Sequence, residues 1–447
     1  MAEQTLSGRK QTAGTGYRWV IFTTLAMAYL FVYFHRLSLS VVADDLVADF
    51  QTSAGVLGLL GSIYFYCYAA MQLPAGLLSD SIGPRKTVTF FLVLASAGSV
   101  LFGLAPNIET AFAGRVLVGF GVSMVFIPTM KILSQWFRKD EFAQMAGILN
   151  AVGGIGVMAA TWLLAIMTAG MGWRLSFEMI GVTTFVIAVL AWLLVRDKPD
   201  DWRDSGSSGS APTESSSVNR ISLLGGARMV ISERSFWPLA VWFFFDCGIF
   251  FGFGGLWSGP YLMNVYGMSR AEAGAVLSMI AWGMIIGSPL WGIVSDRLIR
   301  SRKKPFILSS TVLSVLFIIL CLVPDALPRP ALYVVFFLFS VCSSAIVAIG
   351  FTSAKELFPV EIAGTSVGTV NLFPFLGGAI FMPLLGKILD MYPPNSGSGH
   401  SPEGFTALLS VLLVAALAAL AVSFWIKETY SEAGSGSPAH RLSVKAE

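Results

Sequence analysis

Residues 76–86 read Gly-Leu-Leu-Ser-Asp-Ser-Ile-Gly-Pro-Arg-Lys and stand in a short polar gap between two long apolar stretches. A looser copy, Gly-Ile-Val-Ser-Asp-Arg at residues 292–297, is followed by the basic run Arg-Lys-Lys at 302–304. The two copies lie about half a chain apart. A repeated gap of this kind, acidic and then basic between apolar stretches, predicts a membrane protein built from two similar halves.

The composition is that of a chain surrounded by lipid. Of the 447 residues, 55% are hydrophobic and 12% are charged, whereas soluble domains carry roughly 25% charged residues. The net charge of +3 is too small for nucleic-acid binding. The cysteines lie in apolar segments without the spacing of metal ligands, so we expect small apolar fillers, no metal site and no cofactor.

Several segments are long and apolar enough to cross a membrane, which takes about 20 residues. The twelve segments are 18–42, 55–78, 86–105, 111–136, 143–168, 174–195, 236–264, 271–296, 305–323, 330–355, 361–389 and 404–426. Lys and Arg gather in the gaps on one side, which predicts that this side, with both termini, is cytoplasmic. The fold class that follows is an all-α membrane protein with twelve transmembrane helices in two six-helix bundles.

The longest gap divides the chain into its two halves. Residues 196–235 include a Ser- and Gly-rich stretch that is typical of a flexible linker. We therefore expect a cytoplasmic tail at 1–16, a bundle at 17–195, this cytoplasmic linker, a second bundle at 236–428 and a cytoplasmic tail at 429–447.

Over about residues 17–428 the chain resembles the major facilitator superfamily. The motif at 76–86 matches a loop signature of that superfamily, although Ser81 stands where a basic residue is usual. The run Arg-Val-Leu-Val-Gly-Phe-Gly at 115–121 and the triplet Gly-Trp-Arg at 172–174 add two weaker matches. The resemblance implies a secondary transporter in which two bundles give alternating access to a central site.

Residues 33–40, Tyr-Phe-His-Arg-Leu-Ser-Leu-Ser, are similar to the organic-anion branches of this superfamily, which include anion:cation symporters and organophosphate antiporters. In those branches an Arg at the position of Arg36 contacts the anionic substrate. His35 stands where the symporters often carry an acid, which puts the usual proton-coupling arrangement in question. The resemblance also implies that Arg115 lies in a polar network near the first helix.

The charged residues of the repeated motif are expected to control the conformation. Asp80 ends the second span, and Arg85 and Lys86 follow a Gly-Pro turn, so a charge clamp can form on the cytoplasmic side and release when that side opens. Asp296 and Arg297 repeat the arrangement more loosely. The alternative is that Arg85 and Lys86 only set the topology.

Arg36 is the first candidate for substrate binding. A charge inside a membrane helix costs about 2.5–3.5 kcal/mol, and an Arg can hold a carboxylate or phosphate through two hydrogen bonds. Tyr29 and Tyr33 share its helical face at steps of three or four residues. The alternative, an ion pair with Asp44 or Asp45, is poor because those acids lie roughly 12 Å further along the helix axis.

Three other residues are weaker candidates for substrate contact. Lys131, on the fourth helix, either neutralises an anion or extends to the membrane interface. Trp257 lies in the Gly-rich run 252–260, where the helix bends easily, and it either closes the extracellular mouth or belongs to an aromatic belt. Asn371 can add a hydrogen bond.

Asp246 is the first candidate for proton coupling. It is the only acid well inside the membrane core of the second half, and a buried carboxyl group can take up and release a proton near neutral pH. His35 titrates in the same range and is the second candidate. The alternatives are that Asp246 is a fixed partner for Lys131 or Arg36, and that His35 only packs.

These features predict a monomeric secondary transporter of a small organic anion, a carboxylate or phosphorylated metabolite, that works by proton symport in the cytoplasmic membrane. An enzyme is not expected, because a phosphate-binding loop and a catalytic triad are both missing from the sequence. A proton-coupled exporter of drugs, metabolites or a siderophore and a transporter-like sensor remain as alternatives.

Overall fold

A computed structural model of the chain describes residues 2–199, 223–358, 363–392 and 400–430. All regular elements within these ranges are helices. The chain forms two compact units, residues 1–38 with 63–220 and residues 39–62 with 221–447. Residues 39–62 belong to the second unit, although they lie in the N-terminal half of the sequence.

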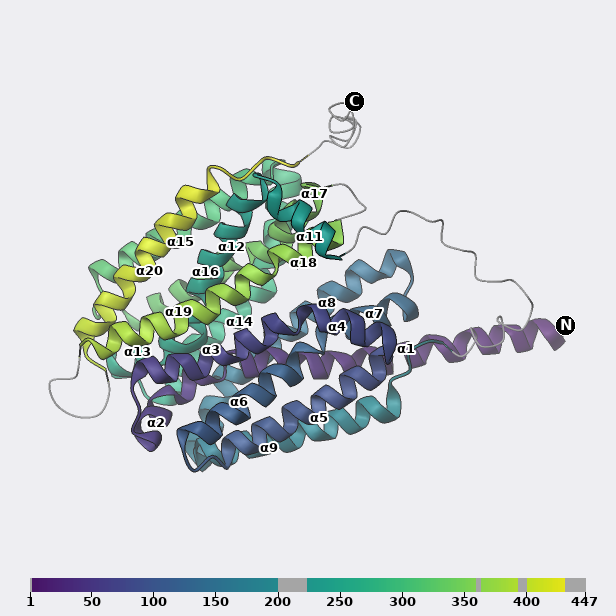
Figure 1. Ribbon diagram of the computed structural model, residues 1–447, viewed down its shortest axis with the longest axis horizontal. Coiled ribbons are helices and arrows are strands. Elements are labelled where there is room, and N and C mark those ends of the chain that lie inside the picture. The colour runs from purple at the N-terminus through teal and green to yellow at the C-terminus, as the bar shows by residue number, and fades with distance from the viewer. Residues whose placement is uncertain (1, 200–222, 359–362, 393–399, 431–447) are drawn as a thin grey trace. The chain divides into compact units, whose positions relative to one another are not determined.

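The first unit contains the helices of the N-terminal half. They are α1 (Ala2–Leu37), α4 (Gln72–Ser81), α5 (Pro84–Gly103), α6 (Ile108–Ser123), α7 (Phe126–Trp136), α8 (Lys139–Met158), the π-helical segment η1 (Ala159–Leu163) and α9 (Leu164–Leu194). Helix α3 (Ala54–Ala70) begins in the second unit and ends in the first. Within the first unit, α5 packs along both α6 and α9 (Figure 1).

The second unit contains one N-terminal helix and the helices of the C-terminal half. They are α2 (Leu39–Phe50), α11 (Leu223–Ser232), α12 (Phe236–Ile249), η2 (Phe250–Trp257), α13 (Ser258–Asn264), α14 (Arg270–Ile293), η3 (Val294–Ile299), α15 (Lys303–Leu322), α16 (Arg329–Ser343), η4 (Ile346–Gly350), α17 (Phe351–Glu356), α18 (Ala363–Val370), α19 (Leu372–Asp390) and α20 (Pro402–Ser423). Here α12 packs against α19 and α20, and α15 runs beside α20 (Figure 1).

Ten helices in the described ranges are long and apolar enough to cross a membrane, and Ala54–Ala70 is a shorter apolar helix. One of the ten, Gln144–Leu194, turns at Gly172 and covers both the fifth and the sixth expected spans. Each expected span therefore has a helical counterpart. The prediction of an all-helical membrane protein is confirmed.

Small residues bring helices of the first unit into backbone contact. A methyl group at Gly98 of α5 would lie 2.7 Å from the carbonyl oxygen of Gly114 in α6. One at Gly181 of α9 would lie 2.9 Å from the backbone nitrogen of Val100 in α5. Membrane helices associate through this kind of close packing, because lipid tails are as apolar as the helix surfaces.

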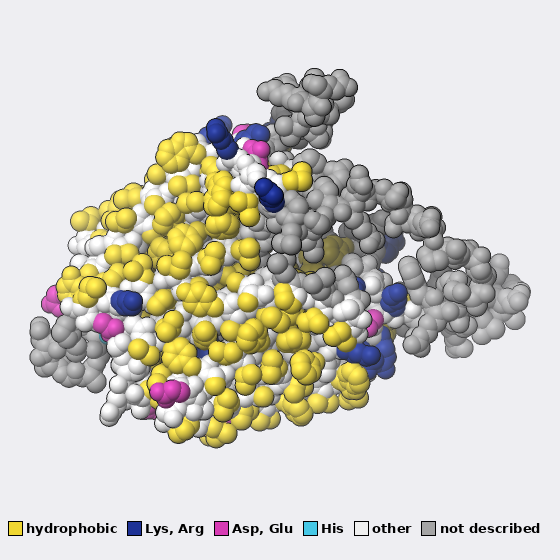
Figure 2. Space-filling model, in the orientation of Figure 1, with side chains coloured by type: hydrophobic (Ala, Val, Ile, Leu, Met, Phe, Trp, Pro, Cys, Tyr) yellow, Lys and Arg dark blue, Asp and Glu magenta, His cyan; other side chains and the backbone are white. Residues whose placement is uncertain are grey.

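The outer faces of the helices are apolar. Large side chains are exposed along α9 at helical spacing, namely Met179, Val182, Val186, Leu190 and Leu193. Figure 2 shows hydrophobic side chains over most of the visible surface of the described residues. Exposed apolar area on this scale is typical of a surface that contacts lipid.

Several of the expected spans are interrupted, the first and the seventh among them. The first ends as α1 at Leu37 and continues as α2 from Leu39. The seventh changes from α12 to the π-helical segment η2, which contains part of the Gly-rich run at 252–260. Because π-helical turns are frequent at functional sites, the residues around these interruptions are the first to consider as a site.

Candidate functional site

The guanidinium group of Arg36 lies among tyrosine rings in the first unit. Its Cζ atom is 4.7 Å from the ring centre of Tyr33, 5.1 Å from that of Tyr68 and 5.9 Å from that of Tyr64. Arg36 is 7% exposed and Tyr64 is completely buried. Attraction between a cation and aromatic faces strengthens away from water, so these rings offset part of the cost of burying the charge.

The rings around Arg36 are tied to their helices. The Tyr64 hydroxyl donates a hydrogen bond of 3.1 Å to the carbonyl oxygen of Val32, which links α3 to α1. Tyr29 meets Tyr33 edge to face at 5.4 Å and packs against Phe126 of α7 at 5.4 Å. The predicted face of Tyr29, Tyr33 and Arg36 is therefore one continuous aromatic surface around a cation.

Tyr64 and Tyr68 were not expected at the site. Both lie on α3, four residues apart, and so face the same side of that helix. The pair of tyrosines at this spacing in an apolar span was a signal in the sequence. The spacing alone could not show that these tyrosines lie beside Arg36, because only the folded structure shows that α3 packs against α1.

Arg115 and His35 lie beside the tyrosine cluster. Arg115 is almost completely buried, and its Nη1 donates to the carbonyl oxygen of His35 at 3.2 Å, while its Cζ lies 5.5 Å from the ring centre of Tyr64. The imidazole of His35 is completely buried next to Phe34, and neither of its nitrogens has a hydrogen-bond partner among the described residues. Arg115 thus links the fourth expected span to the end of α1.

Lys131 lies in another part of the same unit. Its Nζ atom donates to the carbonyl oxygen of Ser79 at 2.8 Å. Ser79 is in the last turn of α4, where carbonyl groups lack partners within the helix. Lys131 therefore joins α7 to the end of α4, at a residue of the charged motif 76–86.

Asp246 is the buried acid of the second unit. It is 2% exposed on α12, with Ser343 and Cys342 of α16 as polar neighbours. Its Oδ2 atom has no hydrogen-bond partner in the part of the chain that the structure describes. A carboxyl group with an unsatisfied oxygen in an apolar setting is suited to holding a proton.

Trp257 and Asn371 occupy helix junctions in the second unit. Trp257 is completely buried at the end of η2, and its indole nitrogen donates to the carbonyl oxygen of Met382 in α19 at 3.0 Å. Its ring lies 5.7 Å from that of His400. Asn371 is half-buried in the break between α18 and α19.

The first copy of the charged motif is held within the N-terminal half. The backbone nitrogen of Arg85 donates to Asp197 Oδ1 at 2.7 Å, and its Nε donates to the carbonyl oxygen of Trp192 at 3.0 Å. Lys86 is exposed. The side chain of Asp80 lies outside the described side chains, so the expected clamp remains a prediction.

The second copy forms a denser network. Asp296 pairs with Arg302, which also contacts Glu356 at 3.0 Å, whereas Arg297 is exposed. Glu428 accepts a hydrogen bond of 2.7 Å from the backbone nitrogen of Arg302, at the start of α15. Burial alone would raise the pKa of Glu428, but hydrogen bonds from Ser301 and from nearby backbone amides lower it. The segment after α20 therefore caps α15.

Among the described residues no group of three or more His, Cys, Asp and Glu side chains is placed to hold a metal ion. The first unit offers a buried guanidinium, phenol groups and an imidazole, and the second unit offers a buried carboxyl group.

Comparison with known proteins identifies one family. The family model of the Major Facilitator Superfamily matches residues 25–258 and again residues 243–446. The two matches correspond to the two halves that the repeated motif predicts.

Two curated relatives span most of the chain. A probable galactarate/D-glucarate transporter, GarP of Escherichia coli K12, is 25% identical over 411 residues, which cover 84% of this chain and 89% of the relative. The membrane sensor protein UhpC of Salmonella typhimurium is 24% identical over 391 residues, which cover 83% and 85%.

A solved structure has the same fold. It is a bacterial homologue of the human lysosomal transporter Spinster, in an inward-facing and unoccupied conformation. Its TM-score is 0.73 at 18% sequence identity, and the match covers 92% of this chain and 97% of that one.

Proposed function

This chain belongs to the major facilitator superfamily, and from that premise we propose that it transports a small organic anion across the cytoplasmic membrane by alternating access. The substrate is a carboxylate or a phosphorylated metabolite, and its movement is coupled to protons. The protein works as a monomer with both termini in the cytoplasm. Two six-helix bundles, residues 17–195 and 236–428, rock about the substrate path.

The observation that carries the proposal is the burial of Arg36 among Tyr33, Tyr64 and Tyr68. The guanidinium group stays charged at any physiological pH, and its planar fork of donors fits a carboxylate or phosphate. Tyrosine rings offset only part of the cost of burying this charge, and a ligand that carries the opposite charge would offset more of it. A substrate of this chemistry neutralises the cation when it arrives.

Relatives support the same class of substrate. One relative is named as a probable galactarate/D-glucarate transporter, and both of these acids carry several hydroxyl groups. The phenol groups of Tyr29, Tyr33 and Tyr68 can donate to or accept from such hydroxyls. We therefore infer that Arg36 holds the acidic group and that the tyrosines contact the neutral part of the substrate.

The first prediction concerns Arg36→Lys, measured as D-glucarate counterflow in proteoliposomes. Lys keeps the charge but loses the bidentate geometry, and one charge-assisted hydrogen bond is worth about 1.5–3 kcal/mol. Apparent affinity should therefore fall by about 10- to 100-fold. Arg329→Lys, at an exposed cation paired with Glu272, is the control and should behave as wild type.

Two results would overturn the proposal. One is equal affinity of Arg36→Lys and wild type for D-glucarate. The other is an absence of flux for a panel of sugar acids, hexose phosphates and other carboxylates.

A transporter-like sensor is the second candidate, because the sensor UhpC matches most of the chain. A sensor would bind the anion without moving it. Saturable binding of D-glucarate with no counterflow in the same proteoliposomes would favour the sensor over the transporter.

A further inference from the structure

Asp390, the last residue of α19, contacts the start of α3. Its Oδ1 atom accepts a hydrogen bond of 2.8 Å from the backbone nitrogen of Ala54, and its Oδ2 accepts one of 2.8 Å from that of Gly55. The two partners lie 336 and 335 residues away in the sequence. One carboxylate therefore binds the first two amides of a membrane helix from the other half of the chain.

The start of α3 suits a carboxylate. The first N–H groups of a helix have no partner within it, and they carry a partial positive charge. Within its own segment, α3 is capped only by Ser53, whose Oγ accepts from the backbone nitrogen of Val56 at 3.3 Å. Asp390 supplies the anion that this helix end lacks.

Glycines let the backbones meet at the same place. A methyl group at Gly386 of α19 would lie 2.2 Å from the carbonyl oxygen of Ala54. A methyl group at Gly58 of α3 would lie 2.5 Å from the carbonyl oxygen of Met382 in α19. Side chains at these positions would push α3 and α19 apart, so the contact between Asp390 and α3 depends on small residues in both helices.

Polar contacts flank this contact on the side of α2. Arg270 of α14 pairs with Asp45 at 2.5 Å, and Asn264 of α13 donates to Asp44 at 3.0 Å. The backbone nitrogen of His400 donates to Asn264 at 3.3 Å. Burial raises the pKa of Asp44 and lowers the pKa of His400, as expected for groups removed from water by tight packing.

We propose that Asp390 is a latch that holds the start of α3 against α19 and so closes the path at this end of the protein. The proposal rests on the transport function, because alternating access requires this end to open in each cycle. In the proposed orientation this is the extracellular end. The Asp390 latch closes the extracellular end, whereas the clamp expected of Asp80 closes the cytoplasmic end.

Opening separates the carboxylate from the amides of Ala54 and Gly55. Until water replaces Asp390, these amides are unsatisfied, and the favourable contact of a carboxylate with a helix end is lost. The latch therefore favours the closed state. Asp390 is a positioning residue for the transport cycle, since it touches a helix end rather than the substrate.

The test measures the distance between nitroxide labels on Ala48→Cys and Glu403→Cys by pulsed electron resonance. Both positions are exposed, and the four native cysteines are replaced by alanine. The full-length protein is measured in lipid nanodiscs without substrate. Asp390→Ala should increase the ratio of long to short distances about tenfold. Asp390→Asn keeps one acceptor oxygen and should give a smaller increase.

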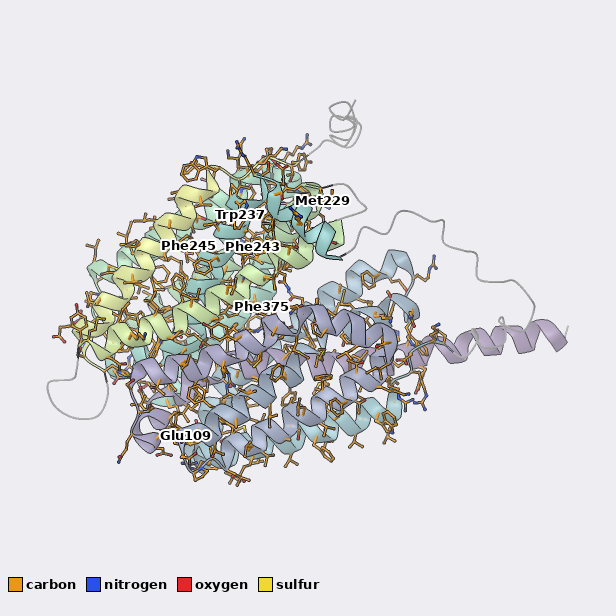
Figure 3. The ribbon with its side chains drawn as sticks, in the orientation of Figure 1. Glu109, Met229, Trp237, Phe243, Phe245 and Phe375 are labelled. Atoms are coloured by element: carbon orange, nitrogen blue, oxygen red, sulfur yellow. The ribbon has the colours of Figure 1, made fainter. Side chains whose placement is uncertain are left out.

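Glu109→Ala is the matched control. Glu109 is an exposed acid in the first turn of α6 (Figure 3), and its loss should leave the distances unchanged. A distribution in Asp390→Ala identical to that of wild type would overturn the latch. If Asp390→Ala does not fold, Asp390→Asn decides by the same criterion.

Transport assays separate this proposal from the one on which it rests. The latch predicts that Asp390→Asn changes kcat for D-glucarate and that Asp390→Glu, which keeps the carboxylate, restores it. Normal flux with unchanged distances refutes the latch and leaves the transporter standing. Altered distances without flux for any anion support the latch and refute the transporter.

Discussion

The ring of Tyr33 lies between the guanidinium group of Arg36 and helix α8, which has a glycine, Gly153, at the contact. A methyl group at Gly153 of α8 would lie 2.8 Å from the Cδ2 and Cε2 atoms of the ring, whose centre is 4.7 Å from Arg36 Cζ. Because glycine leaves this space empty, the ring can rest against α8 and keep its place beside the guanidinium. Gly153 is in this sense a positioning residue for the proposed anion site.

Gly153→Ala is therefore expected to displace Tyr33 and weaken substrate binding. Adding a methyl group to a packed interior costs about 1–3 kcal/mol, and a loss of about 1 kcal/mol corresponds to a roughly fivefold rise in the apparent KM for D-glucarate. Gly147→Ala in the same helix is the control, because a methyl group there meets nothing within 4 Å. Equal KM values for the two variants would contradict this role of Gly153.

At the scale of elements, the turn inside α9 depends on one backbone conformation. Gly172 has φ 77° and ψ 165°, and it separates the fifth from the sixth expected span. This region of conformational space is essentially restricted to glycine. The first residue of the triplet Gly-Trp-Arg at 172–174 is therefore a glycine for a structural reason: the chain reverses its direction at this position.

Gly172→Ala should destabilise the protein by about 1–3 kcal/mol through backbone strain alone. Steric clash does not contribute, because a methyl group at Gly172 meets nothing within 4 Å. Gly170→Ala is the matched control. A methyl group at Gly170 also has no atom within 4 Å, but the backbone there is helical, and alanine is favoured over glycine in a helix by up to about 1 kcal/mol. The thermal unfolding temperature in detergent should fall for the first variant and stay level or rise for the second. A fall of the same size in both would exclude strain at Gly172 as the cause.

At the scale of the whole molecule, the proposed chemistry is shared between the two units. Arg36 belongs to the first unit and Asp246 to the second. If the anion is held by one and the proton by the other, neither unit can couple them alone. The anion and the proton are then coupled because the binding of each one shifts the same conformational equilibrium of the protein.

Asp246→Asn should abolish proton-driven accumulation of D-glucarate but retain counterflow. Asparagine has a similar shape and cannot take up a proton, whereas exchange of substrate for substrate needs no net proton movement. Both are measured in proteoliposomes with an imposed pH gradient. Asp325→Asn, at an exposed acid, is the control. Normal accumulation in Asp246→Asn would leave His35 as the candidate, with His35→Gln as its test.

Much of the architecture follows from the order of residues along the chain. Apolar runs of about 20 residues must be helical, because lipid offers no partners for the backbone. The repeat of the charged motif indicated two halves, and the steps from Tyr29 to Tyr33 and Arg36 placed these residues on one helical face. All of these are local patterns of spacing and composition, so they could be read without knowing which helices meet.

Contacts between distant segments could not be read in this way. Tyr64 and Tyr68 join the site because α3 packs against α1, and Asp390 meets the start of α3 although more than 300 residues separate them. Similarly, Arg302 pairs with Glu356, 54 residues further along the chain. Helices in lipid present similar apolar surfaces to one another, so small residues and a few polar groups select the partners, and only the folded chain brings those groups together.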